Sequence, residues 1–370
     1  METAWIDGKP ASLEEALRAA GTLLGKARQP LVTGLRTDVA GVRAAFLLAL
    51  RAGGIVDHAK SAGLYPFIAA ARDGGAFLAA PGEMRRRADR VLIVGDEPAT
   101  IGADLLRMLA ETTPDLGVRS RGAGRSFMAV SRQTVTLPGG VESDHLDCAS
   151  DDVVDLLGMV RAKLGGRRVG EGAVGDEVVE TVARFLSEAG FAAIIFSPSE
   201  FGEIGTEQIF GLAEDLNQTT RASTLLVVAD PDALGAALQA TWTSGFPLRI
   251  SHGRGEWEHD PALFSSERQI AKEGEADVVV YVDALAGADT SLPPPEKPTI
   301  LIAAGSGQTS GAKVAFKVGA AGRDHDGVLY NARFGDFVAT SAETKSELPT
   351  AAGILDALAS QLGENAEKAA

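Results

Sequence analysis

The chain has a single cysteine, Cys148, among its 370 residues. One thiol excludes an internal disulfide, a CxxC redox pair and an iron–sulfur cluster held by this chain alone, because such a cluster needs about four thiolates. Aromatic residues make up only 5% of the chain, whereas glycine is frequent, with 43 residues. This composition favours closely packed α/β layers over a β-sandwich. The length and the 45% hydrophobic content predict two or three domains.

Excess positive charge and long hydrophobic runs are also lacking. The net charge of −15 and the pI of about 4.9 argue against binding to nucleic acid or to an anionic membrane surface, since both select basic patches. No apolar run reaches about 18 residues, and the first residues do not combine a charged segment with an apolar one. We therefore expect a cytoplasmic protein with neither a membrane nor a nucleic acid as partner.

What the sequence does contain is a repeated alternation of helical and apolar extended segments. Ser12 and Glu15 have the capping-box spacing at the start of a helix, and residues 30–35 form the apolar run that follows it. The alternation predicts an α/β fold of two Rossmann-like domains with parallel sheets. We place the domains at 1–165 and 166–370, because residues 165–175 have the composition of a linker, and the two domains could share strands.

Three further segments are predicted from local pattern. Residues 127–140 mix polar and apolar side chains without a helical stripe, which indicates an extended segment or a hairpin edge. Residues 142–152 are acidic and indicate a loop that leads into a helix. Near the C-terminus, residues 327–338 predict a hairpin and residues 351–361 a final helix.

The stretch from residue 241 to residue 283 has the densest set of unusual side chains. It predicts a strand at 247–251, a glycine–arginine loop, a helix at 261–273 and a second strand at 276–282. That order is typical of a βαβ unit, and in parallel sheets ligands gather beyond the carboxyl ends of the strands. The candidate side chains of this loop are Arg249, His252, Arg254, Trp257 and His259.

Two interpretations of this loop stay open. The guanidinium groups could form an anion or pterin cradle, because they bind phosphate oxygens in bidentate fashion. Alternatively, Arg249, Arg254 and Glu256 form ion pairs, and Trp257 fills a contact between domains or subunits. A metal site is not indicated, because the seven-residue spacing of His252 and His259 fixes neither ring and no third ligand is evident.

Other motifs depart from the sites that they partly resemble. Residues 305–311 (GSGQTSG) do not match a dinucleotide fingerprint, because the third glycine comes one place late and a strand-like run follows. Residues 197–200 (SPSE) lack the G-x-S-x-G elbow of a hydrolase. The acidic residues near Cys148 indicate a solvated surface segment, and a catalytic thiol needs a partner that the sequence does not show. The arginines at 85–87 indicate a solvated helix end.

A family resemblance rests on the same stretch. W-T-S-G-F-P-L at 242–248, the Gly-Arg-Gly loop, the helix and D-V-V-V-Y-V at 277–282 resemble the B subunit of formylmethanofuran dehydrogenase, which carries molybdopterin or tungstopterin. The similarity is greatest to its shortened relative, the B subunit of the formyltransferase/hydrolase complex of methylotrophs. It covers most of the chain and is most specific at 242–283.

The resemblance implies the fold of the central domains of molybdopterin oxidoreductases, without the iron–sulfur and pterin-wrapping domains. A working pterin subunit of that family has an N-terminal cysteine set and a cysteine or selenocysteine on the metal, as such soft centres require. This chain has only Cys148. We therefore expect no catalytic residues, no metal and no cofactor, with the five loop residues as a vestigial cleft.

The role implied by the resemblance is that of a non-catalytic structural component of an enzyme complex, without activity by itself. Its partners would be hydrolase, formyltransferase and β-helical scaffold subunits of a complex that moves formyl groups between tetrahydromethanopterin and methanofuran or methylofuran and releases formate. Two alternatives remain. The chain could be a pterin- or nucleotide-binding oxidoreductase subunit of the formylmethanofuran dehydrogenase type, or a free-standing Rossmann-like binding protein.

Overall fold

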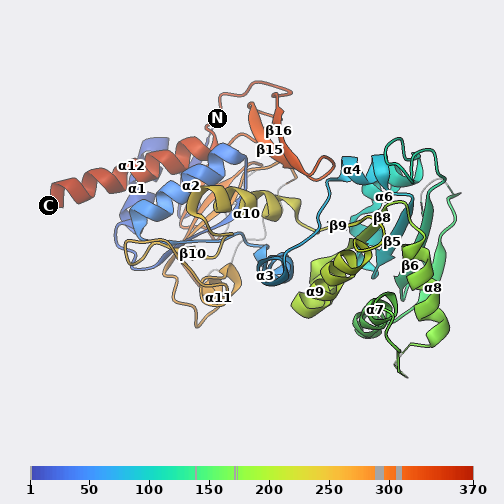
Figure 1. The fold of residues 1–370 in the computed structure, drawn as a ribbon. Coiled ribbons are helices and arrows are strands. Elements are labelled where there is room, and N and C mark those ends of the chain that lie inside the picture. Colours follow the sequence, from blue (N-terminus) through green and yellow to red (C-terminus); the bar gives the residue numbers. More distant parts are fainter. Residues whose placement is uncertain are drawn as a thin grey trace. The chain divides into compact units, whose positions relative to one another are not determined.

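The computed structural model describes residues 2–137, 140–170, 172, 174–287, 296–305 and 311–369. The chain divides into two units, drawn in Figure 1. Unit 1 comprises residues 1–62, 230–331 and 336–370, and unit 2 comprises residues 63–229 and 332–335. Unit 1 is therefore assembled from the two ends of the chain, whereas unit 2 is almost continuous.

Unit 1 is built on a nine-stranded sheet in the order β11-β10-β4-β3-β12-β13-β14-β1-β2. The five strands from β4 to β14 are parallel, and the strands at both edges are antiparallel. The strands are β1 (Ala4–Ile6), β2 (Lys9–Pro10), β3 (Pro30–Arg36), β4 (Ile55–Val56), β10 (Ile250–Ser251), β11 (Glu258–His259), β12 (Val278–Asp283), β13 (Thr299–Ala303) and β14 (Val314–Lys317).

Helices and a hairpin complete unit 1. The helices α1 (Leu13–Leu24), α2 (Val39–Ala52) and α12 (Ala351–Ala369) pack together, and α10 (Pro231–Ser244) packs against α2 (Figure 1). The predicted capping box of α1 is confirmed, since Ser12 and Glu15 exchange hydrogen bonds. The short α11 (Ser266–Ile270) contacts β3. The hairpin of β15 (Gly327–Asn331) and β16 (Asp336–Thr340) confirms the expectation for residues 327–338.

Unit 2 has a five-stranded, wholly parallel sheet in the order β7-β6-β5-β8-β9. Its strands are β5 (Arg90–Val94), β6 (Ser126–Ser131), β7 (Asp144–Asp147), β8 (Ala192–Phe196) and β9 (Ala222–Leu226). In order of sequence this is 3-2-1-4-5, the doubly wound arrangement of Rossmann-type folds. The α/β fold class is thus confirmed, with a wholly parallel sheet in unit 2 and a mixed sheet in unit 1.

Helices cover both faces of the unit 2 sheet. Leu92 and Val94 of β5 join a core with α3 (Tyr65–Gly74), α7 (Ser150–Leu164), α8 (Asp176–Ser187) and α9 (Pro198–Leu216). Val91 and Ile93 point to the opposite core, formed with α4 (Pro81–Arg87) and α6 (Ala103–Ala110), and α5 (Glu97–Ile101) follows β5. The continuous apolar run of β5 follows from burial on both faces.

The structure divides the chain elsewhere than after residue 165. Gly165 ends α7, and α7 and α8 on either side of the 165–175 segment contribute Val160 and Val179 to one core. The glycine-rich segment is therefore a connection inside unit 2. The boundaries between the units, near residues 62 and 230, are not marked by a glycine-rich run like that at 165–175. They follow from strand pairing between distant segments of the chain.

Four local expectations were wrong in whole or in part. β10 pairs antiparallel with β4 and does not form a βαβ unit with β12. The helix expected at 261–273 is limited to α11, because Asp260 caps a separate turn before it. The extended segment expected within 127–140 is confirmed over residues 126–131, which form β6, but β6 is a parallel strand between β5 and β7 and not a hairpin edge. The acidic segment expected to be a loop contains β7. A buried parallel strand needs no alternation, and the polar Ser131 is accommodated at its end.

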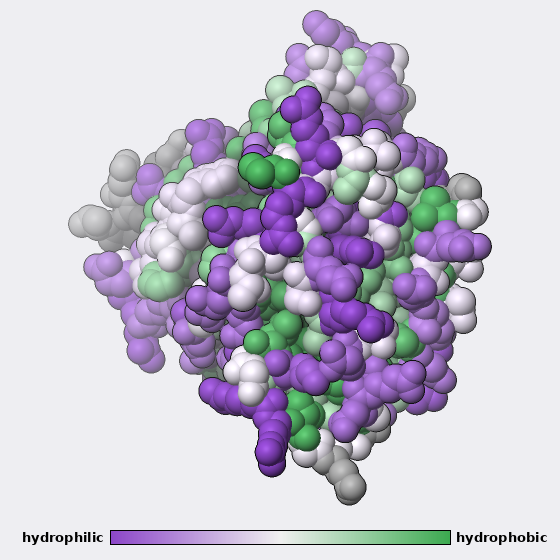
Figure 2. Space-filling model, turned by 45° about the vertical axis from the view of Figure 1, so that its right-hand side comes forward, coloured by the Kyte–Doolittle hydropathy of each residue, from purple (hydrophilic) through white to green (hydrophobic). Residues whose placement is uncertain are grey.

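No helix in the described part of the chain is long and apolar enough to cross a membrane. Figure 2 shows a face on which hydrophilic side chains predominate and hydrophobic ones lie in small patches. The exposed large apolar side chains include Trp242 (59% exposed) and Phe334 (56%).

Candidate functional site

A buried polar cluster lies at the carboxyl end of β4 in unit 1. Asp57 and His58 follow β4 directly, and both are 0% exposed. Asp57 Oδ2 accepts hydrogen bonds from the Ser266 backbone N–H (2.7 Å) and the Ser61 hydroxyl (2.9 Å). The Ser266 hydroxyl lies 2.6 Å from that of Thr33 on β3. The middle of β3 and the end of β4 therefore meet the start of α11 in one hydrogen-bonded cluster.

Arg249 enters this cluster from a strained turn. Leu248 and Arg249 have positive φ angles of 64° and 48°, a conformation that costs a non-glycine residue about 1–2 kcal/mol. The Arg249 Nε donates to Ser61 Oγ (3.2 Å) and lies 4.0 Å from Asp57 Oδ2, and its Nη1 donates to Pro261 O (2.5 Å). Strain of this kind persists only where surrounding contacts impose it, and it concentrates at functional sites.

Burial moves the two titratable groups of the cluster in opposite directions. Desolvation raises the pKa of Asp57 to about 6, although hydrogen bonds from Ser266 and Ser61 and the charge of Arg249 oppose the rise. Desolvation, together with the charges of Arg36 and Lys60, lowers the pKa of His58 to about 3. The end of β4 therefore carries a buried carboxyl group and, on the next residue, a buried neutral imidazole. Perturbed pKa values of this kind are common at functional sites.

The five residues predicted from the loop separate in the structure. Arg249 joins the buried cluster. The His259 ring stacks on Phe246 (5.4 Å between centroids), and its Nδ1 lies 2.9 Å from the Leu248 carbonyl oxygen. His252 and Trp257 pack edge to face at 4.9 Å. Arg254 is exposed and lies 3.4 Å from Glu258. The loop thus turns back as the β10–β11 hairpin, and its histidines do not converge on one point.

Sequence reasoning missed Asp57, His58 and Gln269, which lie in or beside the buried cluster. The available signal was the position of Asp57 and His58 directly after the apolar pair Ile55–Val56, since ligands gather beyond strand ends. β4 pairs over only two residues, so its end was not evident as part of a long strand.

The strand order of unit 1 reverses between β3 and β12, and a charged group from each strand closes that point. β4, β3, β12, β13 and β14 have the order 2-1-3-4-5, whose crevice lies beyond the ends of β3 and β12. There Arg36 Nη1 donates to Asp283 Oδ1 (3.0 Å), and Arg36 Nε donates to Asp232 Oδ2 (3.3 Å). Asp283 is only 2% exposed, so this ion pair occupies the mouth of the crevice.

In unit 2 the corresponding point lies between β5 and β8, and a carboxylate of the chain fills it. Glu200 Oε1 accepts a hydrogen bond from the Asp96 backbone N–H (2.8 Å) and Oε2 accepts one from the Glu97 N–H (3.0 Å). The Ser150 hydroxyl donates to Glu200 Oε1 (3.2 Å). Gly95 has a φ of 88°, and a Cβ there would collide with the Glu200 carboxylate. The absence of a Cβ at Gly95 makes room for this close approach.

The remaining sequence candidates have structural explanations. Cys148 is buried, and desolvation raises the pKa of its thiol to about 11, which opposes the thiolate form that catalysis needs. The Ser197 and Ser199 hydroxyls lie 2.9 Å apart, and Ser199 donates to Glu97 Oε2 (2.7 Å). The 306–310 segment of the predicted glycine loop lies outside the described residues.

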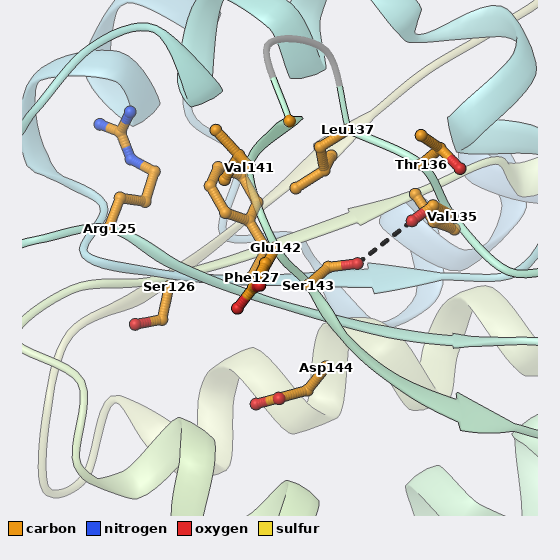
Figure 3. Close-up of a pocket in the computed structure, with 11 residues that line it drawn as sticks. Arg125, Ser126, Phe127, Val135, Thr136, Leu137, Val141, Glu142, Ser143 and Asp144 are labelled. Atoms are coloured by element: carbon orange, nitrogen blue, oxygen red, sulfur yellow. Dashed lines mark hydrogen bonds between the residues drawn. The ribbon is translucent and has the colours of Figure 1, made fainter.

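A pocket of about 540 Å³ lies beside β6 and β7 in unit 2 (Figure 3). Leu137, Val141 and Phe127 provide apolar lining, and Glu142 and Asp144 provide carboxylates. Arg125 also lines it, but its guanidinium donates to the backbone carbonyls of residues 85, 88, 109 and 112. The arginine of this lining is thus committed to holding the surrounding chain.

One group of possible metal ligands exists among the described residues. Oxygen atoms of Asp73, Glu203 and Glu207, on α3 and α9, lie within 4.8 Å of one another, and all three side chains are exposed. Exposed carboxylates on neighbouring helices are ordinary surface features, and this group contains neither histidine nor thiolate.

Comparison with known proteins places the chain in a family. It is 34% identical over 373 residues to the Fhc B subunit of the formyltransferase/hydrolase complex of Methylorubrum extorquens, with 98% of both chains covered. The chain belongs to the family of B subunits of formyltransferase/hydrolase complexes. It also superposes with a TM-score of 0.88 and 32% identity on one chain of the crystal structure of the FhcABCD complex from M. extorquens in complex with methylofuran, covering 98% of this chain and 99% of that chain.

The family has more distant dehydrogenase relatives. The B subunit of the tungsten-containing formylmethanofuran dehydrogenase 2 of Methanococcus maripaludis is 25% identical over 291 residues, and that of Methanocaldococcus jannaschii is 23% identical over 296 residues. Each match covers 76% of this chain and 66% of the relative. No protein-family model matches the chain. The matches to the Fhc B subunit and to the dehydrogenase B subunits confirm the resemblance inferred from residues 242–283.

Proposed function

We propose that the chain is the non-catalytic structural B subunit of a formyltransferase/hydrolase complex in one-carbon metabolism. The observation that carries this proposal is the match to the Fhc B subunit over 98% of both chains at 34% identity. The partners are sister subunits of the complex, and its setting is the cytoplasm. The reaction of the complex moves a formyl group between tetrahydromethanopterin and methylofuran or methanofuran and releases formate.

The two strand-order reversals support a structural role. In doubly wound folds these are the points where ligands bind. Here the Arg36–Asp283 pair occupies one of them, and Glu200 takes the backbone N–H groups at the other. A bound phosphate would have to displace a carboxylate in each unit. The single Cys148, buried with a raised thiol pKa, is poorly suited to act as a metal ligand.

The test is a mild affinity purification of the tagged chain from its native host, compared with an untagged strain. We expect sister subunits with formyl hydrolase and formyltransferase activity to co-purify, with molybdenum and tungsten far below one atom per chain by plasma mass spectrometry. A chain that purifies alone with stoichiometric molybdenum or tungsten would overturn the proposal and favour the pterin-binding alternative.

A further inference from the structure

Three side-chain atoms of unit 1 are buried without a hydrogen-bond partner among the described residues. They are Asp57 Oδ1, His58 Nε2 and Gln269 Oε1. The three residues are 0%, 0% and 1% exposed. Leaving a buried polar atom without a partner costs about 1–3 kcal/mol, so three of them in one region indicate that something other than the protein chain itself serves them.

The segments that carry these atoms are connected directly. Asp57 and His58 are consecutive at the end of β4. Asp57 Oδ2 accepts the N–H of Ser266, the first residue of α11, and Gln269 lies one turn further along the same helix. The cluster is closed by Arg249, whose Nε donates to Ser61. Asp57 is thus linked through Ser266 to the helix that carries Gln269, and His58 is its neighbour in the chain.

The hydrogen-bonding state of each atom follows from its neighbours. The Lys60 backbone N–H donates to His58 Nδ1 (3.0 Å), so Nδ1 is unprotonated and the neutral ring carries its proton on Nε2. Gln269 Nε2 donates to the Leu263 carbonyl oxygen (2.9 Å), so its Oε1 is the free acceptor. Asp57 Oδ1 is an acceptor when the carboxyl is ionised. The region thus presents one donor and two acceptors.

This set of one donor and two acceptors determines which kind of ligand can serve all three atoms. A metal ion would need a lone pair on His58 Nε2, which the hydrogen bond to Nδ1 denies. An ammonium-type cation could donate to both oxygens but could not accept from His58. An anion would meet the Asp57 carboxylate. A water molecule both donates twice and accepts, and buried waters commonly make about three hydrogen bonds to such otherwise unpaired groups.

We propose that Asp57, His58 and Gln269 form an internal hydration site, in which ordered water donates to the Asp57 and Gln269 oxygens and accepts from His58 Nε2. The water is a structural part of unit 1. It connects the end of β4 to α11 beneath the Arg249 turn and removes the cost of the three unpaired atoms. The proposal is independent of the function of the chain.

The direct test is a crystal structure of the wild-type chain, alone or in its complex, at a resolution that shows ordered water. We expect an oxygen-sized peak at about 2.7–3.2 Å from at least two of the three atoms. Direct pairing among the three side chains, an empty space beside them, or a peak with anomalous signal at metal–ligand distance would each overturn the proposal.

A matched pair of variants tests the same point in solution. Gln269→Met keeps the shape of the side chain but removes both polar atoms. Gln239→Met is the control, because Gln239 is 2% exposed and its Nε2 likewise donates to a backbone carbonyl, that of Val39. If water serves Gln269 Oε1, Gln269→Met lowers Tm by at least as much as the control, about 2–4 °C for each 1 kcal/mol lost in a unit of this size.

The change in Tm would differ if no water served Gln269 Oε1. If Gln269 Oε1 is an unpaired acceptor, its replacement by an apolar group removes a desolvation penalty. Gln269→Met then lowers Tm by less than Gln239→Met, or raises it, and the proposal is wrong. Should either variant fail to fold, the wild-type crystal structure still decides between the two outcomes.

Discussion

In both units, side chains fill the point where the strand order of the sheet reverses, but the two units use different side chains and different contacts. Unit 1 uses an ion pair between two side chains, Arg36 and Asp283, one from each strand that flanks the reversal. Unit 2 uses one side chain, Glu200, which binds backbone N–H groups after β5. The comparison shows that a doubly wound sheet can fill its ligand crevice either by pairing charges across strands or by supplying its own carboxylate to the main chain.

Each closure also depends on one glycine with positive φ. Gly34 (φ 80°) makes the irregularity in β3 that sets Arg36 opposite Asp283, and a Cβ there would collide with the Val282 carbonyl oxygen. Gly95 (φ 88°) lets the Glu200 carboxylate approach the main chain. A Cβ added at the unit 1 glycine would meet rigid backbone, whereas a Cβ added at the unit 2 glycine would meet the ends of flexible side chains.

The largest effect that separates the two units is expected from Gly34→Ala against Gly95→Ala. Gly34→Ala should cost about 2–5 kcal/mol, because the left-handed conformation and a clash with backbone add. Gly95→Ala should cost less, since Glu200 and Phe201 can move. Gly53→Ala is the control, because Gly53 has a φ of 61° with nothing within 4 Å of its Cβ position. Denaturant unfolding measures all three, and equal costs would contradict the steric argument.

A smaller effect is expected from removing one charge of the unit 1 closure. Asp283→Asn should cost about 1.5–3 kcal/mol, because a hydrogen bond between charged groups is lost where the side chain is buried. Asp232→Asn removes the other carboxylate on Arg36, but that side chain is 29% exposed, so we expect at most about 1 kcal/mol. Thermal unfolding of both variants checks the order, and a reversed order would show that Asp232 carries the closure.

The remaining comparison concerns pH and has no counterpart in unit 2. The pKa of Asp57 is raised from 3.8 to about 6, so its contribution to stability is fully present below pH 3.8 and is lost as the pH rises through 6. Asp57→Asn removes this dependence. The difference in Tm, variant minus wild type, should therefore become more positive between pH 4 and pH 7, corresponding to about 2 kcal/mol in total.

A second variant sharpens the pH experiment. Arg249 lowers the pKa of Asp57 by its charge, so Arg249→Met should move the transition to higher pH. The contribution of His58 to folding stability has the opposite sign, because the pKa of His58 is lowered to about 3. This contribution is present above pH 6.5 and is lost as the pH falls towards 3. A difference curve that is flat from pH 4 to pH 7 would show that Asp57 does not titrate in this window.

Local patterns predicted most of the regular elements. The apolar run at residues 30–35 lies within β3, and the strand predicted at 276–282 largely coincides with β12. The Ser12 capping box and the hairpin at 327–338 are also as expected. These features depend on apolar runs and on short-range hydrogen bonds, which a sequence displays directly.

The candidate site was predicted only in part because it depends on long-range pairing. The sequence indicated Arg249 but also led us to expect His252 and His259 around it. The positive φ of Leu248 and Arg249 turns the chain into an antiparallel hairpin instead. Asp57 meets Ser266 across a separation of 209 positions, and nothing in either local sequence indicates that contact.

The interleaving of unit 1 sets an order for synthesis. β3 pairs with β12 through Pro30 and Val278, so the central sheet cannot form until the ribosome has passed Val278. The main segment of unit 2, residues 63–229, has been synthesised before that point. Non-local pairing slows folding because loop closure must precede the contact. The N-terminal segment must therefore wait, with its apolar strand unpaired, for a partner strand that is synthesised only after residues 63–229.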